Sequence, residues 1–246
     1  MRIRAVRALA DTAVTLELSD AVGAEASAKV AAAHDAIEKA MASEVLAGVS
    51  EVAAAFCSVT VHYDCLRIAQ SDLIGRLTAL LDPIVPAGRP AGRSWLLPCC
   101  YDTEMGLDLG TLAHDLAMDG DQIIALHQQT TFYVYALGFL PGLPFLGDLP
   151  AELARPRRTD PRTRVPAGSV AIANRMCVIY PWSSPGGWHI VGRCPVPLFD
   201  ISCEIPALIA AGDSIRFRPV GLDEFRVLDR DLRASTRNPA AFQVAC

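Results

Sequence analysis

The segment from Gly138 to Asp200 contains a large share of the chain's 17 prolines and 17 glycines. Proline fixes φ and removes a hydrogen-bond donor, whereas glycine permits positive φ and close backbone approach. Flexible linkers rich in these residues carry Ser, Gln, Lys or Glu, but here large apolar side chains stand between the turns. They are Phe139, Leu140, Phe145, Leu146, Tyr180, Trp182 and Trp188. The segment therefore predicts rigid, packed loops that build a surface.

The length of 246 residues and the content of 52% hydrophobic and 20% charged residues suit one large domain or two modest ones. A net charge of −5 argues against nucleic acid as a partner. No stretch reaches the roughly 20 apolar residues of a membrane helix, and Asp11 interrupts the region where a signal peptide would be apolar. We expect a soluble cytoplasmic protein with no nucleic-acid or membrane partner.

The cysteines and histidines show no metal-ligand spacing, so no metal site is predicted. We expect most cysteines to be reduced and buried, since free cysteine behaves as a small hydrophobic residue. The cysteines are Cys57, Cys65, Cys99, Cys100, Cys177, Cys194, Cys203 and Cys246. A disulfide between Cys99 and Cys100 is not expected, because neighbouring side chains on a strand point to opposite faces.

Residues 1–85 show the pattern of an α+β domain. The predicted elements are one or two strands in 2–18, an amphipathic helix in 26–41, strands in 49–55 and 57–63, and a helix in 71–81. This β-α-β-β-α order is typical of an α+β sandwich. The turn-rich segment 83–93 has no periodicity and is the predicted domain boundary.

Residues 86–246 contain many short strands with few helices. The predicted strands are 94–101, 130–137, 169–173, 177–180, 187–193 and 215–220, with short helices at 109–116 and 123–127. This pattern indicates a β-barrel-like domain. The spacing of Gly142 and Gly147 does not continue into a phosphate-binding loop, and Ser169 lacks the second glycine of a nucleophile elbow.

Five arginines lie between Arg155 and Arg164, and neighbouring prolines hold this run extended. Displayed guanidinium groups are suited to bidentate capture of carboxylate or phosphate, so the run predicts an anionic ligand or partner, with a solvated loop as the alternative. The segment from Ser183 to Gly187 fits either a backbone nest for an anion or a tight hairpin turn. His127 and His189 fit either acid–base chemistry or half-buried hydrogen bonding.

Four motifs occur in an order and spacing that closely resemble the family of 5-oxoprolinase B subunits, which overlaps proteins labelled allophanate hydrolase subunit 1. They are Gly138-Phe-Leu-Pro-Gly142, the run from Pro161 to Val170, Ile179-Tyr-Pro181, and Ser184-Pro-Gly-Gly-Trp-His189 with Gly192-Arg193 after it. Residues 98–109 extend the resemblance over essentially the entire chain. Departures at Leu107, Leu143, Phe145, residues 174–177 and Cys194 bear on substrate choice, because the loss of the usual Gln or Thr removes hydrogen-bonding groups from a pocket.

The resemblance implies a ferredoxin-like domain in residues 1–85 and a cyclophilin-like β-barrel in residues 86–246. It also implies one component of a complex that opens 5-oxoproline to glutamate with ATP. The two partners in that complex are a cyclophilin-like C subunit and an A subunit. ATP is expected at the level of the complex, with a small lactam or amide as substrate. The same motifs leave two alternatives open. One is a component of an allophanate- or urea-type amidohydrolase or carboxyltransferase, and the other is an inhibitor of a sensor histidine kinase that performs no catalysis.

Motif position and residue chemistry together predict the site residues. Arg162 and Arg164 are candidates for charge stabilisation. The candidates for proton transfer or orientation are His127, His189, Tyr101 and Glu104. The predicted substrate- or anion-binding residues are Gly138, Phe139, Pro141, Gly142, Pro166, Gly168, Ser169, Tyr180, Ser184, Pro185, Gly186, Gly187 and Trp188. We expect these segments to converge on one wall of the barrel and form half of a pocket that another polypeptide completes.

Overall fold

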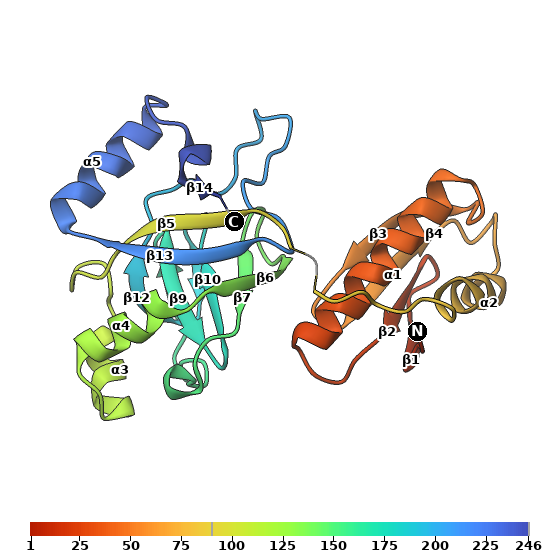
Figure 1. Cartoon of the computed structure of the whole chain (residues 1–246), viewed down its shortest axis with the longest axis horizontal. Helices are drawn as coiled ribbons and strands as arrows, with labels where there is room; N and C mark the ends of the chain where they lie inside the picture. The colour runs from red at the N-terminus through yellow and green to blue at the C-terminus, as the bar shows by residue number, and fades with distance from the viewer. Residues whose placement is uncertain (90, 246) are drawn as a thin grey trace. The chain divides into compact units, whose positions relative to one another are not determined.

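A computed structural model describes residues 1–89 and 91–245. The chain divides into two compact units, residues 1–90 and 91–246, each with its own hydrophobic core (Figure 1). Pro90, within the predicted boundary, and Cys246, one of the predicted buried thiols, lie outside the described residues. Of the helices in the described part, none is both long and apolar enough to cross a membrane.

The first unit is a four-stranded antiparallel sheet with two helices. Its elements are β1 (Ala5–Leu9), β2 (Ala13–Glu17), α1 (Ala24–Ala42), β3 (Val49–Ala54), β4 (Ser58–Tyr63) and α2 (Gln70–Leu81). The strand order is β1-β2-β4-β3. The run from β2 to α2 has the predicted β-α-β-β-α order. The remaining strand of this ferredoxin-like sheet is β1, which pairs with β2 as a hairpin.

Alternation along the strands gives this sheet one buried face. Val14 and Leu16 of β2, with Val59 and Val61 of β4, are fully buried against the two helices. On the opposite face, the hydroxyl oxygens of Thr15 and Thr60 lie 2.9 Å apart. A side-chain period of two residues produces this division.

The second unit contains ten strands and three α-helices in its described part. They are β5 (Ser94–Cys100), α3 (Leu109–Leu116), α4 (Gly120–Gln129), β6 (Phe132–Leu137), β7 (Pro144–Gly147), β8 (Arg162–Val165), β9 (Ser169–Ala173), β10 (Met176–Ile179), β11 (Ser184–Gly186), β12 (His189–Arg193), β13 (Ser214–Val220), α5 (Leu222–Arg233) and β14 (Gln243–Val244). Short 3₁₀ turns occupy Ala151–Leu153 and Pro239–Phe242.

Seven of these strands close into a barrel. Their order is β12-β9-β10-β7-β6-β13-β5, and Arg193 of β12 pairs with Cys100 of β5 to join the two ends. The β13–β5 pair is parallel, while β14 adds to β5 as an antiparallel strand. The barrel prediction is confirmed. The strands β8 and β11 form a separate two-stranded sheet from the arginine run and the predicted nest.

Two apolar clusters hold the barrel and its loops. The interior cluster includes Val170 and Ile172, whereas the alternate residues Ala171 and Ala173 belong to a cluster on the outer surface. In that outer cluster, loop residues such as Leu143 and Trp188 pack against the strands. The Pro- and Gly-rich loops are therefore packed, as predicted. The α3–α4 pair and α5 lie on different sides of the barrel (Figure 1).

The structure contains elements that were not predicted from the sequence. They are helix α5 and the strands β7, β8, β11 and β14. The seven described cysteines are free, and most of them are buried, as predicted: Cys99, Cys100, Cys177 and Cys194. Cys65 and Cys203 are exposed because they lie in loops outside the two cores.

Candidate functional site

A buried carboxylate organises the arginine run. Asp108 precedes α3 and is 2% exposed, yet its side chain does not cap that helix. Its oxygens accept hydrogen bonds from Arg162 at 2.7 Å through both terminal nitrogens, from Arg158 at 2.8 Å, and from the Ile190 N–H at 2.7 Å. Burial alone would raise the pKa of Asp108, but the hydrogen bonds from Arg162 and Ile190 and the two guanidinium charges lower it overall. The carboxylate is therefore ionised.

The other arginines of the run also have neighbours within the chain. Arg155 lies 3.6 Å from a carboxylate oxygen of Asp115, and the Arg157 guanidinium lies 5.7 Å from the centre of the Trp188 ring. The exposed Arg164 donates to the Ser183 hydroxyl at 3.3 Å. The run is extended as predicted, but much of its charge is balanced by carboxylates from the α3 region. Arg164 is the predicted charge-stabilising residue that is open to solvent.

His127 and Tyr101 meet inside the barrel. The Tyr101 hydroxyl lies 2.9 Å from Nδ1 of His127, whose Nε2 lies 3.5 Å from Sγ of Cys177. The imidazole is 1% exposed, and Phe132 and Phe217 flank it. Burial lowers the pKa of His127 to about 3, so the ring is neutral at neutral pH. The sequence predicted them as separate candidates for proton transfer or orientation, and the structure brings them together where a substrate outside the core cannot reach them.

The remaining two acid–base candidates lie apart from this pair. Nε2 of His189 donates to the Pro156 carbonyl at 2.9 Å, while its buried Nδ1 has no partner among the described residues. Glu104 is exposed and lies 3.7 Å from Arg226. The four predicted acid–base residues therefore do not form one constellation within this chain.

The turn at residues 138–143 supports two aromatic side chains. Trp182 Nε1 donates to the Pro141 carbonyl at 3.2 Å, and the Trp182 and Phe199 rings lie 6.2 Å apart in an edge arrangement. Gly142 has a φ of 77°, and a Cβ there would lie 2.7 Å from Cβ of Phe199. Glycine is therefore required for both its conformation and its close contact. Phe139 is exposed beside this turn.

A second glycine joins two other loop segments. Gly168 has a φ of 80°, and a Cβ there would lie 2.3 Å from the Cys194 carbonyl oxygen. Its N–H donates to the Tyr180 carbonyl at 2.7 Å, and its carbonyl accepts from the Cys194 N–H at 2.8 Å. Next to it, Ser169 is 2% exposed and starts β9, beyond the turn that contains Pro166. These contacts fix the 166–168 turn against the loop after β12.

The predicted nest at residues 183–187 is a strand-forming segment. Ser184 and Gly186 of β11 pair with Val165 and Arg162 of β8, around Pro185. The Gly187 carbonyl accepts from the Arg158 N–H at 2.7 Å. The segment is therefore a strand rather than a tight hairpin turn, and it pairs with the arginine run next to Trp188.

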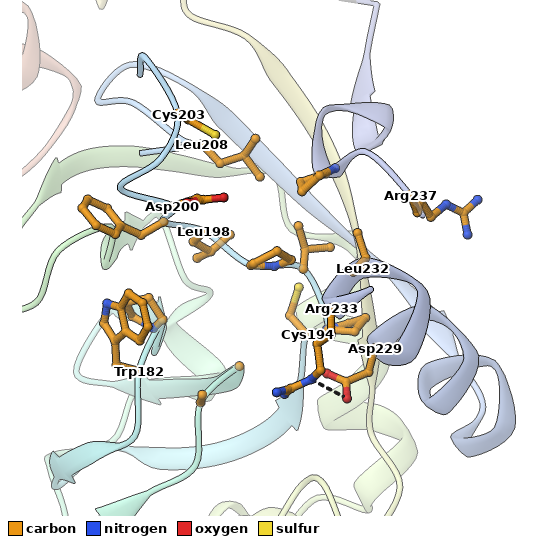
Figure 2. A pocket seen from close by; sticks show the side chains of 18 of the residues that line it. Trp182, Cys194, Leu198, Asp200, Cys203, Leu208, Asp229, Leu232, Arg233 and Arg237 are labelled. Carbon is orange, nitrogen blue, oxygen red and sulfur yellow. Dashed lines mark hydrogen bonds and ion pairs between the residues drawn. The ribbon is translucent and has the colours of Figure 1, made fainter. Parts of the chain in front are cut away.

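A cavity of about 680 Å³ lies between the loop after β12 and the end of α5; we call it the α5 pocket. Figure 2 shows Trp182 on one side and Asp229 and Arg233 of α5 on the other, with Leu198 and Cys194 between them. Gly168 and Tyr180 are the predicted residues that line it, while Pro141 and Gly142 support its aromatic rim. Sequence reasoning missed the residues from α5, whose apolar spacing was the available signal.

The predicted residues therefore lie in several places. Gly168 and Tyr180 line the α5 pocket, Arg162 binds Asp108 beside β11, and His127 and Tyr101 lie inside the barrel. Among the described residues, no group of three or more His, Cys, Asp or Glu side chains could hold a metal ion.

Comparison with known proteins decides the family. Residues 4–209 match the family described as carboxyltransferase domain, subdomain C and D. The chain is 31% identical to the B subunit of 5-oxoprolinase from Bacillus subtilis (strain 168), over 86% of this chain and 91% of that protein. The chain belongs to the family of 5-oxoprolinase B subunits. A second member, from Escherichia coli O157:H7, is 41% identical over 53% of this chain and 60% of its own length.

Solved structures of related proteins share the fold of this member of the 5-oxoprolinase B-subunit family. The crystal structure of TTHA0988 superposes with a TM-score of 0.72 at 34% identity, covering 85% of this chain and 40% of that one. Urea carboxylase of Kluyveromyces lactis has a TM-score of 0.73 at 20% identity, covering 92% of this chain and 22% of its own. This second likeness shows the fold alone. Helix α5 and residues 234–239 lie beyond the matched carboxyltransferase region.

Proposed function

We propose that this chain is the B subunit of an ATP-dependent 5-oxoprolinase that converts 5-oxoproline to glutamate in the cytoplasm. In this proposal two further polypeptides complete the enzyme. They are a cyclophilin-like C subunit and an A subunit. The observation that carries the proposal is the similarity to the 5-oxoprolinase protein of Bacillus subtilis, because it extends over nearly the full length of both proteins.

The arrangement of ionisable groups supports a protein that does not act alone. His127 and Tyr101 are enclosed in the barrel, and Arg158 and Arg162 are engaged by Asp108. Phosphoryl transfer from ATP to the amide oxygen would activate the lactam carbon for attack by water. The C–N bond then breaks as the ring nitrogen takes a proton from a donor, and a second water hydrolyses the resulting acyl phosphate to glutamate and phosphate. The proposal assigns the nucleotide and the remaining acid–base groups to the assembled complex.

Arg164 is the residue of this chain that we propose for charge stabilisation in that complex. It is exposed on β8, and its only side-chain hydrogen bond within the described residues is the 3.3 Å bond to the Ser183 hydroxyl. A guanidinium in this position has donors available for a carboxylate or phosphate from outside the chain. Arg162 would instead position β8 through Asp108.

Reconstitution tests the proposal. The purified chain is mixed with its C and A partners, and ADP formation is measured with and without 5-oxoproline. We expect turnover that depends on 5-oxoproline and on all three polypeptides, and none from the single chain. The change Arg164→Ala should lower the turnover number about 100-fold, the usual cost of removing one charge-stabilising donor. The matched control is Arg216→Ala, an exposed arginine on β13. Full turnover by the single chain, or ATP hydrolysis indifferent to 5-oxoproline, would overturn the proposal.

A further inference from the structure

The α5 pocket has the size and lining of a small-molecule site. Its volume of about 680 Å³ falls within the roughly 300–1,000 Å³ of ligand pockets, which combine apolar walls with a few polar groups. Tyr180, Trp182 and Phe199 form an aromatic end. Asp229 and Arg233 form a charged end on α5 (Figure 2).

The charged end presents an oriented guanidinium. Nε of Arg233 donates to Oδ2 of Asp229 at 2.9 Å, one turn earlier on α5. In the described part of the chain, the two terminal nitrogens of Arg233 have no hydrogen-bond acceptor. Because Asp229 accepts the hydrogen bond from Nε, the edge of the guanidinium formed by its two terminal nitrogens remains available for a ligand. Two parallel N–H donors on that edge match the geometry of a carboxylate.

The local charge balance favours an anion. Arg193 lies close enough for its pKa to respond to Asp229 and Arg233, after burial as the main cause of its lowering. Among the charged residues that line the pocket, Arg233 and Arg237 balance Asp229 and Asp200, and the nearby Arg193 adds one positive charge in a chain of net charge −5. Asp200, at the other end of the pocket, is already engaged by the Ser202 N–H and hydroxyl.

The carboxyl end of α5 does not cancel this charge. The N–H groups of Ala234, Ser235 and Thr236 donate to the carbonyls of Arg230, Leu232 and Asp231. These bonds satisfy carbonyls that would otherwise lack a partner at the end of the helix. The partial negative charge of a helix end is about half an elementary charge, so the full charge of Arg233 outweighs it.

The aromatic end is equally fixed. The hydrogen bond from Trp182 Nε1 to Pro141 and the edge contact with Phe199 hold the indole in place. Figure 2 shows Trp182 across the pocket from Arg233. A ligand with a compact ring and a carboxylate would find an apolar surface and a guanidinium in the same pocket. The ring would replace water on an apolar surface, and the carboxylate would meet the guanidinium.

We propose that the α5 pocket binds a small cyclic carboxylate, with its ring against Trp182 and its carboxylate on Arg233. Resting on the proposed function, that ligand is 5-oxoproline, a five-membered lactam that carries one carboxylate. The residues of the charged wall lie after residue 209, outside the carboxyltransferase region shared with other proteins. The charged wall is therefore a feature of this part of the chain, whereas the aromatic end belongs to the matched region.

Two exposed thiols provide a direct binding assay on the full-length chain. Cys203 lines the α5 pocket, whereas Cys65 lies in the other compact unit. Alkylation of each thiol is followed by mass spectrometry with and without 5-oxoproline, alongside calorimetric titration. We expect 5-oxoproline to slow the alkylation of Cys203 at least threefold and to leave Cys65 unchanged. The carboxamide of 5-oxoproline, which lacks the negative charge, should bind at least tenfold more weakly.

A matched pair of variants tests the role of Arg233. The change Arg233→Gln should weaken 5-oxoproline binding at least tenfold. Arg226→Gln is the control, because it makes the same change on the same helix about two turns away from the pocket. Equal affinities of the two variants, or alkylation of Cys203 that ignores 5-oxoproline, would overturn the pocket assignment.

The outcomes separate this inference from the proposed function. If the reconstituted complex opens 5-oxoproline with unchanged KM in the Arg233→Gln variant, the pocket assignment fails and the proposed function stands. If 5-oxoproline binds with dependence on Arg233 but the complex never opens it, the proposed function fails and the cyclic-carboxylate site stands.

Discussion

At the scale of single residues, Asp108 joins the arginine run to the start of α3. One carboxylate, almost fully buried, accepts hydrogen bonds from two guanidinium groups and one backbone N–H. A buried ion pair contributes modestly compared with an apolar replacement, but removing one partner leaves charge without compensation. The orientation of β8, and with it of Arg164, therefore depends on this residue.

We predict that Asp108→Asn destabilises the protein by about 3–5 kcal/mol, because Arg158 and Arg162 would keep their charges without a buried anion. The measurement is urea unfolding followed by fluorescence. The control is Asp115→Asn, which removes the partner of Arg155 at a partly exposed site and should cost at most about 1 kcal/mol. Equal effects of the two changes would contradict the role assigned to Asp108.

His127 makes a separate prediction for the pH dependence of stability. Its folded pKa of about 3 lies below its ordinary value, so on acidification the unfolded chain takes up the proton first. The stability contributed by the neutral imidazole is complete above about pH 6.5 and decreases by roughly 1.4 kcal/mol per pH unit below that value. The variant His127→Gln keeps a hydrogen-bonding group near Tyr101. Its unfolding free energy should depend less steeply on pH, by roughly 1.4 kcal/mol per pH unit, the equivalent of one proton.

The measurement is the free energy of unfolding from pH 4 to pH 8 for both proteins. The other histidines are common to both and serve as the internal control. Asp108 acts in a lower window, since its folded pKa is depressed and its contribution is lost only as pH falls below the ordinary aspartate range. Parallel curves for the two proteins would show that His127 is not a buried neutral group.

At the scale of elements, α5 shows how a short charged helix can be overlooked. The apolar residues Phe225, Leu228 and Leu232 recur at helical spacing and are buried. Acidic residues in its first turn and Arg230 and Arg233 in its last turn complement the helix dipole. The signal was therefore present in the sequence, but high charge and the absence of a capping side chain concealed it.

We predict that Leu228→Ala costs about 2–5 kcal/mol in unfolding free energy, since it creates a cavity beneath α5. The neighbouring change Val227→Ala affects an exposed side chain and should alter stability by no more than about 0.5 kcal/mol. Chemical denaturation of both variants provides the measurement. If both variants unfold like the parent chain, α5 is not packed on the barrel.

The arginine run shows a different relation between local and tertiary structure. Pro161 and Pro166 bracket an extended segment, and this segment is the strand β8. Local restriction of φ therefore predicted its conformation. The anions that balance its charge come from residues at least 40 positions earlier in the chain, and no local pattern indicates which carboxylate they would be.

At the scale of the whole molecule, the two compact units have independent apolar cores. A domain with its own core can fold alone when it buries enough apolar surface. We predict that residues 91–246 expressed alone unfold cooperatively and keep Cys99, Cys177 and Cys194 protected from alkylation in the native state. Cys203 should remain reactive and serves as the control. Rapid alkylation of all four thiols would show that the barrel unit requires residues 1–90.

The sequence by itself determined the order of helices and strands in residues 1–85, the packed character of the Pro- and Gly-rich loops and, through its motifs, the resemblance to the family. The first two properties depend on side-chain periodicity and φ restriction, which act between residues close in the chain. Only the tertiary structure decided that Asp108 meets Arg162, that His127 and Tyr101 face the barrel interior, and that α5 forms one wall of the pocket. Desolvation and Coulomb interactions depend on distance through space, and the closed barrel sets those distances.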